Sequence, residues 1–128
     1  MMDLSALAVM TPDDIRARGE DAALAAFKRM RWPETNGAPV CPRCGTGHPY
    51  DIATRGTFKC RSCYHQFSPV SGTIFASRKM PFGQMLIVTC CLLRGQSAIK
   101  AAAEANCQWR TAYDLAIKLR LQMQEHKQ

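Results

Sequence analysis

The sequence predicts a small α+β protein with an N-terminal helix, a ribbon of short antiparallel strands and a C-terminal group of three helices. Three observations support this fold class: two CxxC pairs fifteen residues apart, short aromatic segments that each adjoin a CxxC pair, and apolar residues at helical spacing before and after them. We expect the 128 residues to divide into an N-terminal helical segment (1–36), a zinc ribbon (37–79) and a helix-turn-helix domain (80–128).

The first helix is predicted to begin at Thr11 and to end at Trp32. In TPDD, residues 11–14, the threonine can cap the helix, the proline takes the first helical position and two aspartates lie at the positive end of the helix dipole. Gly19 is expected to interrupt the helix. Apolar residues at helical spacing follow it, at Ala23, Leu24, Phe27 and Met30. The residue before a proline disfavours helix, so WP ends it and ETNGAP forms a loop.

The ribbon is predicted from two short strands, 57–60 (TFKC) and 64–68 (YHQFS), each adjoining one CxxC pair. From Phe82 the apolar period becomes helical, and this helix is expected to stop at Gly95. Ser97 is expected to cap a second helix, SAIKAAAEA, and Asn106 to adopt the left-handed conformation that closes a tight turn. A third helix is predicted from about Trp109 to beyond Arg120.

The four paired cysteines have the spacing of a structural zinc site, with Cys41, Cys44, Cys60 and Cys63 as ligands. Four thiolates close the coordination shell, so we expect one Zn²⁺ that stabilises the fold and leaves no open position for catalysis. The alternatives are a thioredoxin-like redox pair and incidental buried thiols. His48 and His65 are expected to lie beside the ligands, at the surface or against phosphates. Three further cysteines, Cys90, Cys91 and Cys107, are interpreted as small buried hydrophobic residues.

The formal net charge is +7, and its distribution indicates a polyanionic partner such as nucleic acid. Residues 28–79 contain nine Lys and Arg against two acids, residues 80–128 six against three, and residues 1–27 two against five. The excess therefore lies on the ribbon and its flanks, where Arg43, Arg55, Lys59 and Arg61 are candidates for phosphate contacts. The alternative is an ordinary solvated surface, and Arg61 in particular can face solvent.

The sequence also indicates the compartment. The first ten residues, MMDLSALAVM, carry an acid where a signal peptide is basic and contain no cleavage site. The longest apolar run, residues 85–93, is about half the roughly 18 residues of a membrane span. The seven cysteines, an odd number, suit a reducing environment. We therefore expect a cytoplasmic, bacterial and nucleoid-associated protein with no membrane contact.

The segment SAIKAAAEANCQWRTAYDLAIKLR, residues 97–120, has the pattern of a helix-turn-helix. In that motif the second helix enters the major groove of double-stranded DNA with its N-terminus first. The candidates for contacts with bases and nearby phosphates are Gln108, Trp109, Arg110, Thr111 and Asp114, and Lys118 and Arg120 are expected further along the helix, towards the DNA backbone. The alternative is an ordinary helical hairpin in which Trp109 and Tyr113 simply pack.

Three segments taken together resemble the N-terminal half of zinc-ribbon insertion-sequence transposases, whose catalytic part is an ISXO-type DDE domain. They are RMRWPETNGAPVCPRCG, FKCRSCYHQFSPVSGTIFASRKMP and SAIKAAAEANCQWRTAYDLAIKLR, and they cover residues 27 to about 120. The resemblance implies that Cys41, Cys44, Cys60 and Cys63 bind zinc and that residues 108–113 begin a recognition helix. Asn106 stands where the family often has the turn glycine.

The resemblance also implies a catalytic domain after the third helix, whereas the sequence ends at Gln128. Two-metal strand transfer needs clustered carboxylates, and the acidic residues here are scattered, so we expect no enzymatic activity. We expect a sequence-specific DNA-binding protein that acts as a transcriptional regulator, as a homodimer or with a partner such as RNA polymerase or a transposase. The alternatives are a protein-binding zinc-ribbon adaptor and a truncated transposase that competes with an intact relative for transposon ends.

Overall fold

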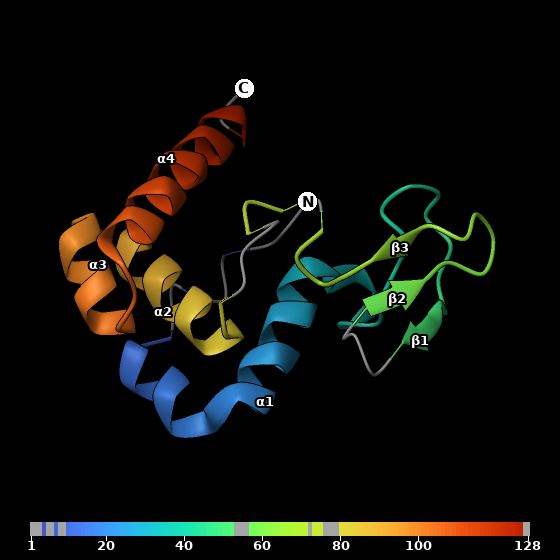
Figure 1. Ribbon diagram of the computed structural model, residues 1–128, viewed down its shortest axis with the longest axis horizontal. Helices are drawn as coiled ribbons and strands as arrows, with labels where there is room; N and C mark the ends of the chain where they lie inside the picture. The colour runs from blue at the N-terminus through green and yellow to red at the C-terminus, as the bar shows by residue number, and fades with distance from the viewer. Residues whose placement is uncertain are drawn as a thin grey trace. The chain divides into compact units, whose positions relative to one another are not determined.

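A computed structural model of the protein describes Leu4, Leu7 and residues 10–52, 57–71, 73–75 and 80–126. Within these residues the chain forms four α-helices, one 3₁₀ turn and a three-stranded antiparallel sheet of order β1-β2-β3, which confirms the mixed α+β fold class (Figure 1). The elements are α1 (Pro12–Arg31), η2 (Pro33–Thr35), β1 (Tyr50–Ile52), β2 (Thr57–Lys59), β3 (Gln66–Phe67), α2 (Phe82–Leu93), α3 (Ala98–Ala105) and α4 (Trp109–His126).

The chain divides into two compact units, with the boundary inside α1 between Leu24 and Ala25. The ribbon unit contains Ala25–Arg78, and the helical unit contains Leu4–Leu24 and Lys79–Gln128. The two halves of α1 therefore belong to different units. The three segments expected from the sequence (1–36, 37–79 and 80–128) stay a prediction.

Helix α1 begins and ends where the sequence predicts. The Asp14 amide donates a hydrogen bond to Thr11 Oγ1 at 3.1 Å, so Thr11 caps the helix. Gly19 has φ 86° and ψ 178°, a conformation outside the helical region, and it kinks α1 at this point. The helix ends at Arg31, and Trp32 enters the loop with φ −129°.

The core of the ribbon unit is aromatic. Trp32 is buried against Phe58 of β2 and Phe67 of β3, with both ring centroids 6.3 Å from that of Trp32 in edge-on arrangements. Phe58 and Phe67, which are cross-strand partners, lie 5.5 Å apart. Such pairs stabilise a core beyond their buried area. β2 and β3 fall within the two predicted strand segments, whereas β1 was not predicted.

The helical unit is built around α2, in which every side chain from 85 to 91 is buried. The left-handed Gly95, at φ 84°, follows α2, and Ser97 Oγ then accepts a hydrogen bond from the Lys100 amide at 3.3 Å, so Ser97 caps α3 as predicted. Asn106 adopts the predicted left-handed conformation, at φ 56°, and α4 begins three residues later. No helix in the described part of the chain is long and apolar enough to cross a membrane.

The first half of α1 supplies polar groups to the ends of two other helices in the helical unit. Pro81 precedes α2 and has no capping side chain, and the Glu20 carboxylate accepts hydrogen bonds from the Phe82 and Gly83 amides at 2.5 and 3.0 Å instead. Arg16 donates to the main-chain carbonyl of Glu104 near the end of α3 and pairs with its carboxylate at 2.5 Å. Both contacts satisfy groups that a helix end leaves unpaired and suit the sign of its dipole.

We predict that Glu20→Ala destabilises the helical unit by about 1 kcal/mol, because the Phe82 and Gly83 amides lose the carboxylate that accepts their hydrogen bonds. Denaturant unfolding followed by the helical circular dichroism signal measures this change. Asp21→Ala is the matched control, since it removes the same charge from an adjacent exposed position of α1. Equal losses in the two variants would show that the charge of α1 matters and that the cap does not.

Candidate metal centre and basic surfaces

The two CxxC pairs form two turns of the same construction. In the first turn the Cys41 amide donates to the Thr46 carbonyl at 3.0 Å, and the Gly45 amide donates to the Cys41 carbonyl at 2.9 Å. In the second turn the Cys60 amide donates to the His65 carbonyl at 2.9 Å, and the Tyr64 amide donates to the Cys60 carbonyl at 3.1 Å. The residue after each second cysteine is left-handed, with φ 80° at Gly45 and φ 60° at Tyr64.

The four sulfur atoms of Cys41, Cys44, Cys60 and Cys63 converge, and all lie within 4.8 Å of one another. Cys41 and Cys63 Sγ are 3.6 Å apart, and Cys44 and Cys60 Sγ are 3.4 Å apart. A tetrahedral zinc site with metal–sulfur bonds of about 2.3 Å has sulfur–sulfur edges of about 3.8 Å. The separations are too long for a disulfide, whose S–S bond is about 2.05 Å. The cluster therefore fits one structural zinc ion with no open position.

Backbone amides point at the sulfur atoms, as a thiolate site requires. The amides of Ser62 and Cys63 donate to Cys60 Sγ at 3.3 and 3.4 Å, and the hydrogen bond from Cys63 is the main cause that lowers the pKa of Cys60. Cys44 Sγ lies 3.2 Å from Thr46 Oγ1, and its hydrogen bonds with the Thr46 side chain and backbone lower the pKa of Cys44 to about 6. These contacts favour the charged form that binds metal.

One thiol of the cluster, Cys63, resists ionisation. A hydrogen bond with the His65 backbone lowers the pKa of Cys63. Burial and the nearby thiols, Cys41 first among them, together raise it by more, so that the pKa is about 11. Like charges this close disfavour one another, and a divalent ion removes that repulsion. The chemistry of the donor set therefore matches a Zn²⁺ ion held by four thiolates.

Residues 18–66 match the family model of the transposase zinc-ribbon domain. The match runs from Arg18 in α1 to Gln66 in β3 and includes Trp32 and all four cysteines of the cluster. No curated protein and no solved structure matches the chain. The chain therefore carries a zinc ribbon of the transposase type, as the motifs of the sequence predict, with a cysteine cluster able to bind one metal ion.

The described strands around the transposase-type ribbon are antiparallel, so they do not offer the βαβ context of a thioredoxin-like redox pair. The other cysteines are free thiols in the helical unit: Cys90 and Cys91 are fully buried and Cys107 is half-buried, as expected for small hydrophobic residues. His65 stacks on Phe67 with ring centroids 6.4 Å apart, and His48 is exposed with φ 55°.

The predicted phosphate-binding residues of the ribbon have different surroundings. Arg43 is exposed in the first turn. The Arg61 guanidinium lies 4.1 Å from the centroid of the Tyr50 ring and donates to the His48 carbonyl at 2.5 Å, and Lys59 Nζ lies 5.5 Å from the Tyr64 ring. Arg55 lies outside the described residues.

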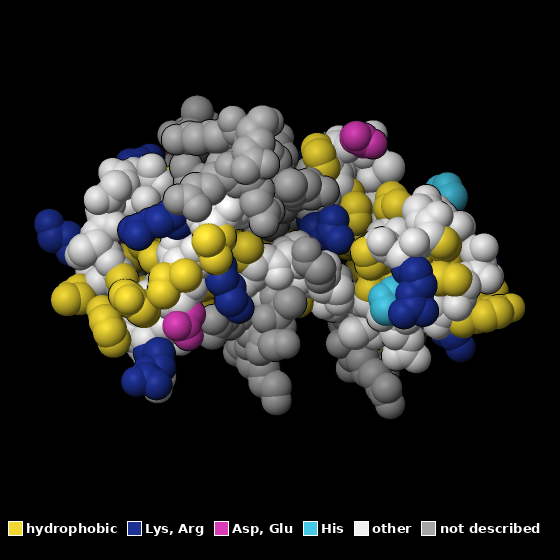
Figure 2. All heavy atoms as spheres, turned by 90° about the horizontal axis from the view of Figure 1, so that it is seen from above, with side chains coloured by type: hydrophobic (Ala, Val, Ile, Leu, Met, Phe, Trp, Pro, Cys, Tyr) yellow, Lys and Arg dark blue, Asp and Glu magenta, His cyan; other side chains and the backbone are white. Residues whose placement is uncertain are grey.

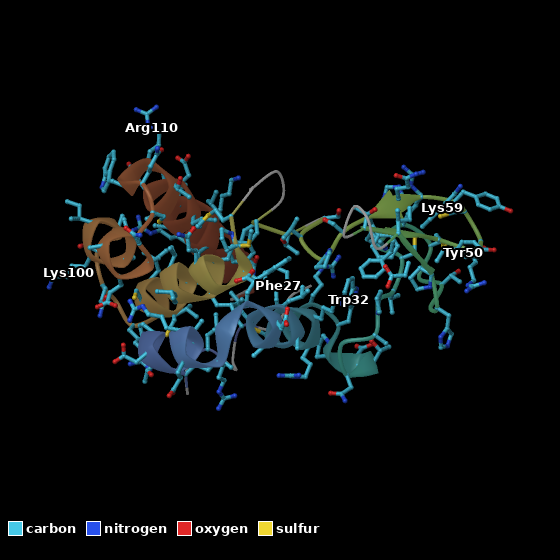
Figure 3. The ribbon with its side chains drawn as sticks, turned by 60° about the horizontal axis from the view of Figure 1, so that its bottom comes forward. Phe27, Trp32, Tyr50, Lys59, Lys100 and Arg110 are labelled. Atoms are coloured by element: carbon cyan, nitrogen blue, oxygen red, sulfur yellow. The ribbon has the colours of Figure 1, made fainter. Side chains whose placement is uncertain are left out.

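The predicted base-reading residues lie at the start of α4. Gln108, Trp109, Arg110 and Lys118 are exposed, whereas Thr111 and Asp114 are half-buried. In Figure 3 the Arg110 side chain points away from the helices. Trp109 stacks on Tyr113, with the ring centroids 5.2 Å apart, and both side chains are exposed. On the face shown in Figure 2, hydrophobic side chains lie beside Lys and Arg side chains.

The sequence interpretation missed two surface features. One is Tyr50 and Tyr64 beside the cations of the ribbon. Comparing CPRCG with CRSCY shows a tyrosine where the first turn has glycine, which singles out Tyr64, whereas no sequence signal singles out Tyr50. The other is an exposed apolar row on α4, which we call the α4 stripe, at Trp109, Tyr113, Ile117 and Leu121. Its four-residue spacing is visible in the sequence, but only the packing of Ala112, Leu115 and Leu119 shows that the row faces outward.

We predict that Cys60→Ser loses the bound zinc and unfolds the ribbon, because removing one ligand leaves three thiolates around the cation. Metal analysis of the purified protein measures the first effect, and tryptophan fluorescence in a Trp109→Phe background, which leaves Trp32 as the emitting residue, measures the second. Cys107→Ser is the matched control, since it removes a thiol from the helical unit and is expected to retain one zinc ion per chain. Full zinc content in Cys60→Ser would contradict the ligand assignment.

Proposed function

We propose that this protein binds double-stranded DNA in a sequence-dependent manner and acts as a regulator built from the DNA-binding half of a transposase. The observation that carries the proposal is the pair α3 and α4, which are joined by a three-residue turn and leave Gln108, Trp109 and Arg110 at the start of α4 exposed. This is the arrangement in which a recognition helix enters the major groove.

The construction of the turn supports the proposal. Ala101, Ala102 and Ala105 are buried, and their small side chains let α3 pack closely on its neighbours. The Cys107 amide donates to the Ala102 carbonyl at 3.0 Å, and Gln84 of α2 donates to the Asn106 carbonyl at 3.3 Å. The turn is thus held from both sides, and Gln108 and Arg110 project from a fixed backbone. A pre-formed first turn lowers the cost of ordering these side chains on a base edge.

The ribbon complements this role through charge. Residues 28–79 carry nine basic residues against two acids, and the described candidates Arg43, Lys59 and Arg61 come from the two cysteine turns and β2. Such contacts strengthen binding to any sequence by releasing counterions. We therefore assign general affinity to the ribbon and sequence preference to α4. The proposal includes no catalysis, which an assay of DNA cleavage and strand transfer with Mg²⁺ tests directly.

We predict that Arg110→Ala lowers affinity for the preferred duplex by about 1–3 kcal/mol and relaxes preference, as expected for a side chain that reads a guanine. Lys59→Ala is expected to lower the affinity for all duplex sequences by the same factor and to reduce the salt dependence of binding. Selection from a random duplex pool gives the preferred sequence, and fluorescence anisotropy on preferred and scrambled duplexes gives the losses. If Arg110→Ala and Lys59→Ala each lower the affinity for the preferred and the scrambled duplex equally, the assignment of sequence preference to α4 and general affinity to the ribbon is wrong.

A second candidate function, protein docking, is favoured by the α4 stripe. Its side chains are between 42% and 55% exposed, and they adjoin a groove of about 560 Å³ lined by α4, the end of α2 and the start of α3. A row of large apolar residues four apart is the ridge that packs against another helix. A second copy of the chain or another protein can provide that helix.

We predict that Ile117→Glu reduces self-association of the purified protein, measured by sedimentation over a range of concentrations, because a carboxylate interrupts the stripe at its centre. Lys118→Glu is the control for charge at the adjacent exposed position. If Ile117→Glu instead leaves association unchanged and abolishes duplex binding, the stripe contacts DNA and the docking candidate fails.

A further inference from the structure

The outer face of the ribbon sheet carries one side chain from each strand, of which Tyr50 and Gln66 are exposed and Lys59 is half-buried. Tyr50 of β1 pairs with Lys59 of β2, and Lys59 pairs with Gln66 of β3, so these three side chains share one face. The opposite face carries Phe58 and Phe67, which pack on Trp32. The outer row is therefore not needed for the core. Figure 3 shows Tyr50 and Lys59 on the sheet.

Two cations and two tyrosines extend this row. Lys59 Nζ lies 5.5 Å from the Tyr64 ring, and the Arg61 guanidinium lies 4.1 Å from the Tyr50 ring. Arg61 Nε also donates a hydrogen bond to the His48 carbonyl, which helps to hold the guanidinium beside the Tyr50 ring. We call Tyr50, Lys59, Arg61 and Tyr64 the ribbon platform. The acid of β1, Asp51, pairs with Phe58 and lies on the other face.

Tyr64 occupies its position at an energetic cost. The equivalent position of the first cysteine turn is Gly45, which tolerates positive φ, whereas a tyrosine at φ 60° is strained. The Tyr64 ring is also 65% exposed, so burial does not compensate for that strain. Strained residues of this kind cluster at ligand-binding and active sites, which makes Tyr64 a candidate for contact with a ligand. The ring is then available for a partner that presents a flat face.

We propose that the ribbon platform binds unpaired nucleotides, with the bases stacking on Tyr50 and Tyr64 and the phosphates lying against Lys59 and Arg61. Aromatic rings interleaved with cations on an open sheet face are suited to single strands, since every base offers a π face and every linkage a negative charge. In a duplex those faces are covered by neighbouring bases. The inference rests on the proposed DNA binding and adds a distinct ligand, a frayed or single-stranded segment.

The experiment uses the full chain with zinc and two labelled probes: a single-stranded oligonucleotide of about 12 nucleotides, within the usual site size, and the duplex of the same sequence. Tyr50→Ala and Tyr64→Gly are expected to weaken single-strand binding roughly 5- to 150-fold each and to change duplex binding less than about twofold. Tyr50→Phe and Tyr64→Phe keep the rings and are expected to bind as the wild type does.

Unfolding would not explain a loss of binding by Tyr64→Gly. Glycine tolerates the positive φ at this position, so this variant is expected to raise the unfolding temperature of the zinc-loaded protein. If neither Tyr64→Gly nor Tyr50→Ala weakens binding to the single strand, the platform proposal is overturned and the duplex proposal stands. The same holds if these variants weaken binding to the single strand and to the duplex equally. A wild-type protein that binds the duplex and not the single strand also overturns the platform. If the protein binds the single strand through the two tyrosines but does not bind the duplex, the proposed function is overturned and the platform proposal stands.

Discussion

The ribbon unit depends on the attraction between four thiolates and one divalent cation. Its three strands contain only two or three residues each, too few to form a stable sheet alone. The two cysteine turns are built by the same pair of backbone hydrogen bonds, and they bring the sulfur atoms within 4.8 Å of one another. Structural zinc binding contributes about 10–16 kcal/mol in zinc-finger peptides, more than a core of this size provides. Trp32, Phe58 and Phe67 then cover one face of the sheet.

Helix α1 takes part in both units through different halves. Its second half leads into Trp32 and the aromatic core of the ribbon unit, while its first half places Glu20 and Arg16 at the ends of α2 and α3. The helical unit is consequently stabilised by long-range caps as well as by the apolar surface of α2. A mutation on the exposed side of α1 can therefore disturb the helices that carry the proposed DNA-reading residues without touching those residues.

The molecule presents surfaces of different chemistry. The start of α4 offers polar and cationic side chains on a fixed turn, the α4 stripe offers apolar ones, and the ribbon platform offers tyrosines in contact with cations. Hydrogen-bonding groups suit base edges, apolar ridges suit another protein, and flat rings suit unpaired bases. Under the two proposals, the ribbon would supply general affinity, the start of α4 sequence preference, and the ribbon platform sensitivity to strand separation.

The sequence alone determined features that depend on neighbouring residues. Local chemistry predicts the cap at Thr11, the break at Gly19, the end of α1 before Pro33 and the left-handed Asn106, and CxxC spacing alone is enough to name four metal ligands. Only the tertiary structure decided that Glu20 caps α2, that Tyr50 and Lys59 share a sheet face, and that the α4 stripe faces outward. The physical reason is that capping at a distance, strand register and exposure depend on contacts between segments that lie far apart in the chain.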